Sequence, residues 1–308
     1  MAMAAEIGAA QTATSTYPTK SVRWVVPFPA GGSNDIVARI IGQKLGESLG
    51  QPFLADNRSG AGGMVGAETV AKANPDGYTL LLANAGPSLN NVLMRRNPPY
   101  KVSDFAQVVW FGYAPLIIVT SSSSPLKTAR DLVAVARENP GKLTWGVFGL
   151  GGVPHLQFYS LLLDAKADMV AVPYKSIATM MADATGGQLD IGVTAFGSFG
   201  VGTVRVLASL AGQRNELYPD VPAAPELGYR VSDSAYGGFL APKGTPTEAL
   251  TALEGACAKA AETARWKDVL KRTGSPGPYL GAAAYAKRLR EDSRVKGELV
   301  RILGIKAE

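Results

Sequence analysis

The sequence has very little of two residue types on which much protein chemistry depends. Its 308 residues include one cysteine, Cys257, and one histidine, His155. A single cysteine excludes a disulfide within the chain and a zinc site built from cysteines. A single histidine excludes a metal site of several histidines, and a Ser-His-Asp or Cys-His arrangement would have to use His155, around which no G-x-S-x-G elbow occurs. We therefore expect neither a metal nor a cofactor.

The motifs of nucleotide-binding proteins are missing as well. No G-x-x-x-x-G-K-[ST] loop occurs. The glycines of residues 60–66 come near the dinucleotide fingerprint, but the last one is a place late and no acidic residue ends the next strand. Residues 143–163 approach the length of a membrane span, yet glycine and proline interrupt them, which favours a buried strand, loop and helix. We expect no transmembrane segment.

Charge gives a weaker indication. The formal net charge is +6, and the basic residues are scattered. The densest group lies near the C-terminus, in predicted helices, and is more typical of a solvated helix face than of a nucleic-acid surface. We expect no nucleic-acid partner, and a mildly positive field is compatible with anionic ligands.

The most informative run is residues 24–40, WVVPFPAGGSNDIVARI. An apolar strand enters a loop of proline and glycine, and apolar residues then recur with a helical period from about Asn34. Small residues allow the backbone to approach a ligand closely, and the unpaired N–H groups of a helix start favour anions. This loop is a candidate cradle for a carboxylate or phosphate. Its candidate binding residues are Phe28, Ala30, Gly31, Gly32, Ser33, Asn34 and Asp35.

Two further strand ends have the same form. Residues 78–94 place Asn84 and Gly86 after a strand, and residues 143–163 place Gly149, Gly151 and Gly152 between a strand and a helix. Ligands of open parallel sheets bind in the crevice outside the carboxyl ends of the strands. The spacing of the first and last of these loops suggests two lobes that face one cleft.

Several single residues allow two interpretations. His155, in the first turn of a predicted helix, could donate to a ligand carboxylate or simply pack and cap backbone groups. Asp35 could favour its helix N-terminus, or contact an amine or hydroxyl of a ligand. Tyr174, at a strand end, could line the pocket or lie on the surface, and Phe28 and Phe196 could be pocket or core residues.

The length of the chain favours two domains. We expect residues 17–120 and 232–308 to form one lobe and residues 121–231 to form a second lobe inserted into it. Two crossings between the lobes would make a hinge around a ligand cleft.

The chain resembles the Bug-type receptors, the extracytoplasmic solute-binding proteins of tripartite tricarboxylate transporters. The resemblance runs from Tyr17 to the C-terminus, and its most specific segments are the first two. The matching segments are 17–39, 49–81, 139–143 (NPGKL), 172–175 (VPYK), 218–228 (YPDVPAAPELG) and 241–246 (APKGTP).

The resemblance implies an α/β, two-lobed periplasmic-binding-protein (Venus flytrap) fold, in which each lobe is a mainly parallel sheet flanked by helices. It implies that the first loop holds one carboxylate of the ligand, while the second lobe meets the other end near Gly149 to His155 and near Thr194 to Gly197. The chain departs from the family pattern at Gly151 to Pro154 and at Ser176, and Phe148 and Phe196 could make the pocket less polar.

The function implied is the capture of a small di-, tri- or aromatic carboxylate in the periplasm, without catalysis, and its delivery to a membrane permease. We expect a monomer, and the resemblance implies an exported protein. Residues 1–17 have neither a basic nor a continuous apolar signal region, so we expect a mature chain from which the signal peptide is absent. Two alternatives stay open: a sensor that presents its ligand to a regulatory partner, and an enzyme that acts on a carboxylate through His155.

Overall fold

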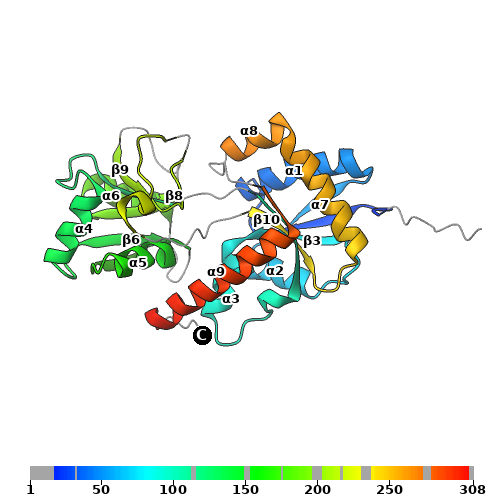
Figure 1. Cartoon of the computed structure of the whole chain (residues 1–308), viewed down its shortest axis with the longest axis horizontal. Coiled ribbons are helices and arrows are strands. Elements are labelled where there is room, and N and C mark those ends of the chain that lie inside the picture. Colours follow the sequence, from blue (N-terminus) through cyan, green and yellow to red (C-terminus); the bar gives the residue numbers. More distant parts are fainter. Residues whose placement is uncertain are drawn as a thin grey trace, which may run out of the picture.

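The computed structural model describes residues 17–31, 33–111, 116–148, 153–174, 176–195, 203–215, 218–229, 237–272 and 279–304. Within these residues, two separate sheets are flanked by helices, which confirms the α/β class (Figure 1). The first sheet has the order β11-β4-β10-β3-β1-β2, and the second has the order β7-β6-β8-β5-β9.

The elements of the first sheet come from both ends of the chain. Its strands are β1 (Val22–Val26), β2 (Phe53–Asn57), β3 (Thr79–Asn84), β4 (Phe105–Phe111), β10 (Gly237–Pro242) and β11 (Tyr279–Gly281). Its helices are α1 (Ser33–Leu49), α2 (Met64–Ala71), α3 (Asn91–Met94), α7 (Thr247–Glu262), α8 (Ala264–Arg272) and α9 (Ala282–Leu303), with the short turns η1 (Ala61–Gly63), η2 (Gly86–Asn90) and η3 (Val102–Asp104).

The second sheet is built from the middle of the chain. Its strands are β5 (Leu116–Ser121), β6 (Thr144–Phe148), β7 (Val170–Tyr174), β8 (Ile191–Ala195) and β9 (Val204–Ser209). Its helices are α4 (Ala129–Glu138), α5 (Val153–Asp164) and α6 (Ile177–Gly186), with the short turn η4 (Ala224–Leu227).

The expectation of mainly parallel sheets was wrong. β1 pairs in parallel with β2 and β3, and β6 pairs in parallel with β7 and β8. By contrast, β10 is antiparallel to β3 and β4, β11 is antiparallel to β4, and β5 is antiparallel to β8 and β9. The mixture follows from the path of the chain, because β4 runs toward the second sheet and its neighbour β10 brings the chain back.

The chain passes from the first sheet to the second between Phe111 and Leu116, and returns between Tyr229 and Gly237. The boundary expected between residues 120 and 121 lies within β5, which begins at Leu116 and pairs with β8 of the second sheet. We propose that the two lobes divide at these two crossings.

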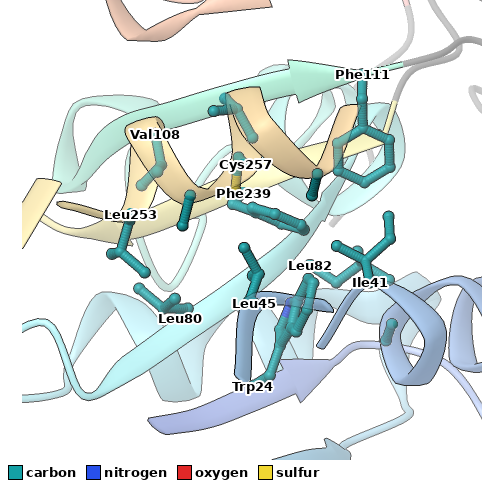
Figure 2. Close-up of a cluster of buried hydrophobic side chains, with 14 of the residues drawn as sticks. Trp24, Ile41, Leu45, Leu80, Leu82, Val108, Phe111, Phe239, Leu253 and Cys257 are labelled. Carbon is teal, nitrogen blue, oxygen red and sulfur yellow. The ribbon is translucent and has the colours of Figure 1, made fainter. Parts of the chain in front are cut away.

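Apolar side chains on both faces of the first sheet explain why it is covered on both sides. Successive residues of a strand point to opposite faces. Trp24 packs with Phe239 under α1 and α7, with ring centroids 4.2 Å apart (Figure 2). Val25, on the other face, packs with residues of α2 and α9. The free thiol of Cys257 lies in the first of these two layers, and burial raises its pKa.

The second sheet is covered in the same manner. All residues of β5 are buried, with Ile118 facing the layer of α4 and α5 and Ile117 facing α6. Thr128 begins α4 as its N-cap and accepts a hydrogen bond from the Asp131 N–H, which satisfies one of the free donors of the helix start.

The long helix α9 contacts elements of both sheets. Tyr285 and Leu289 pack under the first sheet, while Val300, about three turns after Leu289, packs against Met94 of α3 and Leu156 of α5. Figure 1 shows α9 extending below the first sheet toward α5. Among the described residues, no helix combines the length and the apolar character needed to cross a membrane.

Candidate ligand-binding site

The carboxyl ends of the parallel strands in the first sheet meet at one edge. In the register of this sheet, Val26 lies beside Asn57, and Val25 lies beside Leu81. The loops that follow β1, β2 and β3 therefore leave the sheet at the same edge. Gly237 lies opposite both Asn84 and Phe111, so the end of β4, where the chain departs, belongs to this edge as well.

The second sheet has a corresponding edge. Phe148 at the end of β6 lies beside Tyr174 at the end of β7. Gly146 lies beside Gly192, which brings Thr194 near the end of β6. Leu116, the first residue of β5, lies opposite Ala195, the last residue of β8.

These two edges lie on either side of the first crossing. The chain from Phe111 to Leu116 can span at most about 18 Å even when fully extended. Since Phe111 lies at the carboxyl edge of the first sheet and Leu116 at the carboxyl edge of the second, the crossing joins the two edges. The described strand ends from which the predicted loops of both halves of the chain leave therefore lie at the two edges that this crossing joins.

The loop after β1 is held by side chains at its base. The Nδ2 of Asn57 donates to the backbone oxygen of Phe28 at 3.1 Å, and the N–H of Gly31 donates to Oδ2 of Asp35 at 2.9 Å. Ala30 and Gly31 are exposed, whereas Phe28 is half-buried. Gly31 has a φ of 81°, which favours glycine, and a Cβ at this position would have no atom within 4 Å. The loop is a fixed, exposed turn with room beside it.

Asp35 supports this loop from below. Its side chain is buried, and Oδ2 accepts from Nε of Arg39 at 3.0 Å as well as from Gly31. The hydrogen bonds from Arg39 and from the Gly31 backbone lower the pKa of Asp35 from 3.8 to about 2. Its second oxygen, Oδ1, is buried and has no hydrogen-bond partner in the described part of the chain. The charge of Asp35 is therefore compensated within α1, where it opposes an incoming anion less than an isolated carboxylate would.

The lowered pKa of Asp35 predicts how its contribution depends on pH. An ionised Asp35 stabilises the folded state, so this contribution is present above the ordinary value of 3.8 and is lost as the pH falls through about 2. We expect Asp35→Asn to lower the free energy of unfolding at pH 7 by about 1–3 kcal/mol, since a buried, charge-assisted hydrogen bond is weakened. Urea unfolding of both proteins between pH 7 and pH 2 measures this. A difference between the two proteins that does not shrink below pH 4 would contradict the assignment.

The loop after β3 is organised by Asn84. Its backbone N–H donates to Oγ of the buried Ser88 at 3.2 Å, and its Oδ1 accepts from the N–H of Gly86 at 3.4 Å. Asn84 and Gly86 are half-buried at the edge of the sheet. These contacts bind the loop to itself.

His155 lies in the first turn of α5, as expected, but most of its ring faces inward. Its ring centroid is 5.5 Å from that of Trp145 and 6.3 Å from that of Tyr159. The side chain is buried, and burial lowers the pKa of the imidazole, so it is neutral at pH 7. The contacts support the packing interpretation of His155, and a donor role toward a carboxylate stays a prediction.

The side chains of Tyr174, at the end of β7, and Thr194, near the end of β8, differ in their hydrogen bonding. The hydroxyl of Tyr174 donates to Oδ2 of Asp183 at 2.7 Å and thereby ties β7 to α6; burial and this carboxylate raise its pKa to about 12. Thr194 is buried, and its Oγ1 has no hydrogen-bond partner within the described ranges. Of these two hydroxyl groups, that of Tyr174 is thus committed to Asp183, whereas that of Thr194 is unpaired within the described residues.

Some predicted residues lie outside the described part of the chain. They are Gly32, Gly149, Gly151, Gly152 and Phe196, and the side chain of Ser33 is likewise not described. Asn34 lies half-buried in the first turn of α1.

Two residues that the sequence reasoning missed hold the first loop. Asn57, the last residue of β2, binds the loop through Phe28 and also accepts from Arg39 at 3.3 Å. The sequence offers one sign of this role, because Asn57 is a polar residue at the end of an apolar strand segment. Gly66 in α2 is the second: a Cβ there would lie 2.9 Å from the Cα of Pro27 and from the backbone oxygen of Arg58, so only glycine allows α2 to approach so closely.

The described residues contain no group of three or more histidine, cysteine, aspartate or glutamate side chains that could hold a metal ion. The groups collected at the two edges are backbone N–H groups, amides and hydroxyls. Such donors suit the recognition of an anion by several hydrogen bonds.

Comparison with known proteins identifies the family. Residues 37–305 match the family described as "Tripartite tricarboxylate transporter family receptor". The chain is similar to "Protein BugT" of Bordetella pertussis, with 34% identity over 252 residues that cover 80% of this chain and 77% of that protein.

Two solved structures are similar over nearly the whole chain. "R. palustris Rpa4515 with adipate" is 29% identical with a TM-score of 0.78 and covers 94% of this chain and 99% of the other. "MatC (Rpa3494) from Rhodopseudomonas palustris with bound malate" is 26% identical with a TM-score of 0.72 and covers 92% and 100%. The chain therefore belongs to the tripartite tricarboxylate transporter receptor family and is a Bug-type receptor.

Proposed function

We propose that this receptor captures a small organic carboxylate in the periplasm and delivers it to the permease of a tripartite tricarboxylate transport system. It acts by closure of the two lobes around the ligand and carries out no chemical step. The observation that carries the proposal is the position of the loop from Phe28 to Asp35. Its described part is held by Asn57 and Asp35, exposes Ala30 and Gly31, and leads into α1 at the carboxyl edge of the first sheet.

The proposed site residues divide between the two lobes. Phe28 to Asp35, with Asn84 and Gly86, hold one carboxylate from the first lobe. Thr194 and the chain before His155 meet the other end from the second lobe. The adipate and malate bound to the two similar proteins are both dicarboxylates, which supports a ligand with a carboxylate at each end.

Thermal unfolding against a panel of acids tests this function. The protein is first unfolded and refolded to remove any ligand that co-purified, and is then heated with malate, adipate, citrate and benzoate. A ligand at a hundredfold excess over its Kd adds about 2.7 kcal/mol of stability. We expect a midpoint raised by roughly 5 °C or more for one chemical class of acid, because each kcal/mol shifts a protein of this size by about 2–4 °C.

The matched control is the diamide or ester of the best acid, which keeps the shape and removes the charge. Equal stabilisation by acid and diamide would contradict a carboxylate receptor. Conversion of the acid during incubation, followed by NMR, would contradict a receptor without catalysis.

A further inference from the structure

A line of two hollows follows one face of α9. It consists of a hollow of about 340 Å³ and a hollow of about 630 Å³. The α9 residues that line them recur every three or four positions from Ala286 to Gly304, and residues 93–107 form the opposite wall. One helix face of this length spans about 27 Å. We call these two hollows the α9 groove.

The described residues give the α9 groove positive charge alone. Arg290 lines the smaller hollow, and Arg95, Arg96 and Arg301 line the larger one; no acidic residue of the described ranges lines either. These four arginines form no ion pair with a described residue. Arg288 on the same helix differs from them, since its Nε lies 3.1 Å from Oδ1 of Asp292.

The larger apolar residues that line the two hollows are mostly buried, and Leu93 is half-buried. Phe105 and Leu289 line the smaller hollow, and Leu93 and Val300 line the larger one. A small carboxylate would occupy only a fraction of such a surface. The row of guanidinium groups over this length matches an extended peptide with several acidic side chains.

We propose that the α9 groove binds an acidic segment of a partner protein. Arginine favours this occupant, because its planar guanidinium binds carboxylates with two hydrogen bonds. The site is also suited to sense the arrangement of the lobes. Val300 lines the groove and at the same time packs against Leu156 of α5, which covers the second sheet. This inference goes beyond the proposed capture of a carboxylate and does not depend on it.

Fluorescence anisotropy with a labelled peptide tests the α9 groove. The probe is a dodecapeptide of alternating glutamate and alanine, and its counterpart has glutamine in place of glutamate. We expect the glutamate peptide to bind and the glutamine peptide not to bind. The double variant R96E/R301E should weaken binding at least about tenfold at physiological ionic strength, because two favourable charge pairs become repulsive.

A matched variant separates this site from the general charge of the protein. R130E/K142E reverses two exposed charges on the second sheet's side and changes the net charge equally. We expect it to bind the glutamate peptide within about twofold of the unchanged protein. All four substituted residues are exposed, so both variants should fold, and both should keep the thermal shift caused by a carboxylate.

Three outcomes would overturn the proposal. The first is absence of binding by the glutamate peptide, and the second is an equal loss in both variants. The third is a result in which R96E/R301E abolishes binding to phosphatidylglycerol vesicles and leaves peptide binding unchanged, which would indicate that the groove binds a membrane surface.

Discussion

Replacement of Gly31 by aspartate should abolish carboxylate binding, whereas replacement by asparagine should weaken it only a few-fold. Both side chains tolerate the left-handed backbone that a φ of 81° requires, and a Cβ at this position meets no atom within 4 Å. The two variants therefore carry almost the same strain and bulk, and differ in charge. A carboxylate placed beside a bound carboxylate costs several kcal/mol, which corresponds to about a hundredfold or more in affinity.

Isothermal titration with the acid identified by the thermal panel measures this difference. The unfolding midpoints of the two variants without ligand should agree within a few degrees, which checks that the loop still folds. The Gly31→Asp protein should also lose the thermal shift with that acid. Equal affinities of the aspartate and asparagine variants would contradict the assignment of this loop to the ligand carboxylate.

The features that the sequence predicts well are those in which neighbouring residues determine the structure. The strand of residues 22–26, its loop and the helix from Ser33 follow one another as expected, and the residues near the C-terminus form helices, α8 and α9, as predicted. In each case hydrophobic periodicity and the positions of glycine and proline are local signals. The loops after β1 and β3 could be recognised for the same reason.

The features that the sequence does not predict depend on distant partners. β10 lies at the centre of the first sheet, yet it starts with two glycines and ends in a proline, and its partners β3 and β4 precede it by more than a hundred residues. Its antiparallel direction follows from the return of the chain, which no local pattern records. The inward orientation of Asp35 toward Gly31 and Arg39 depends on side-chain rotamers, so the spacing alone left its role open.

Replacement of Gly66 by alanine should distort the loop after β1, because α2 packs against this loop at Pro27. A Cβ on Gly66 would lie 2.9 Å from Cα and Cβ of Pro27 and from the backbone oxygen of Arg58. These are mostly backbone atoms, which cannot rotate away, so α2 or the loop after β1 must shift. We expect the free energy of unfolding to fall by about 1–3 kcal/mol, as for other overpacked interiors. Since Pro27 precedes Phe28 in the loop, we also expect ligand affinity to fall about tenfold.

Gly255→Ala is the matched control, because it makes the same change at an exposed position of α7 where a Cβ meets no atom within 4 Å. Alanine in a helix interior is favoured over glycine by about 1 kcal/mol, so this variant should gain stability and bind the ligand unchanged. Urea unfolding and isothermal titration of both variants give the comparison. If Gly66→Ala were as stable as Gly255→Ala, the close approach of α2 to Pro27 would not be what positions the loop. If Gly66→Ala lost stability but kept its affinity, the shift would be absorbed by α2, and the loop would be held by Asn57 and Asp35 alone.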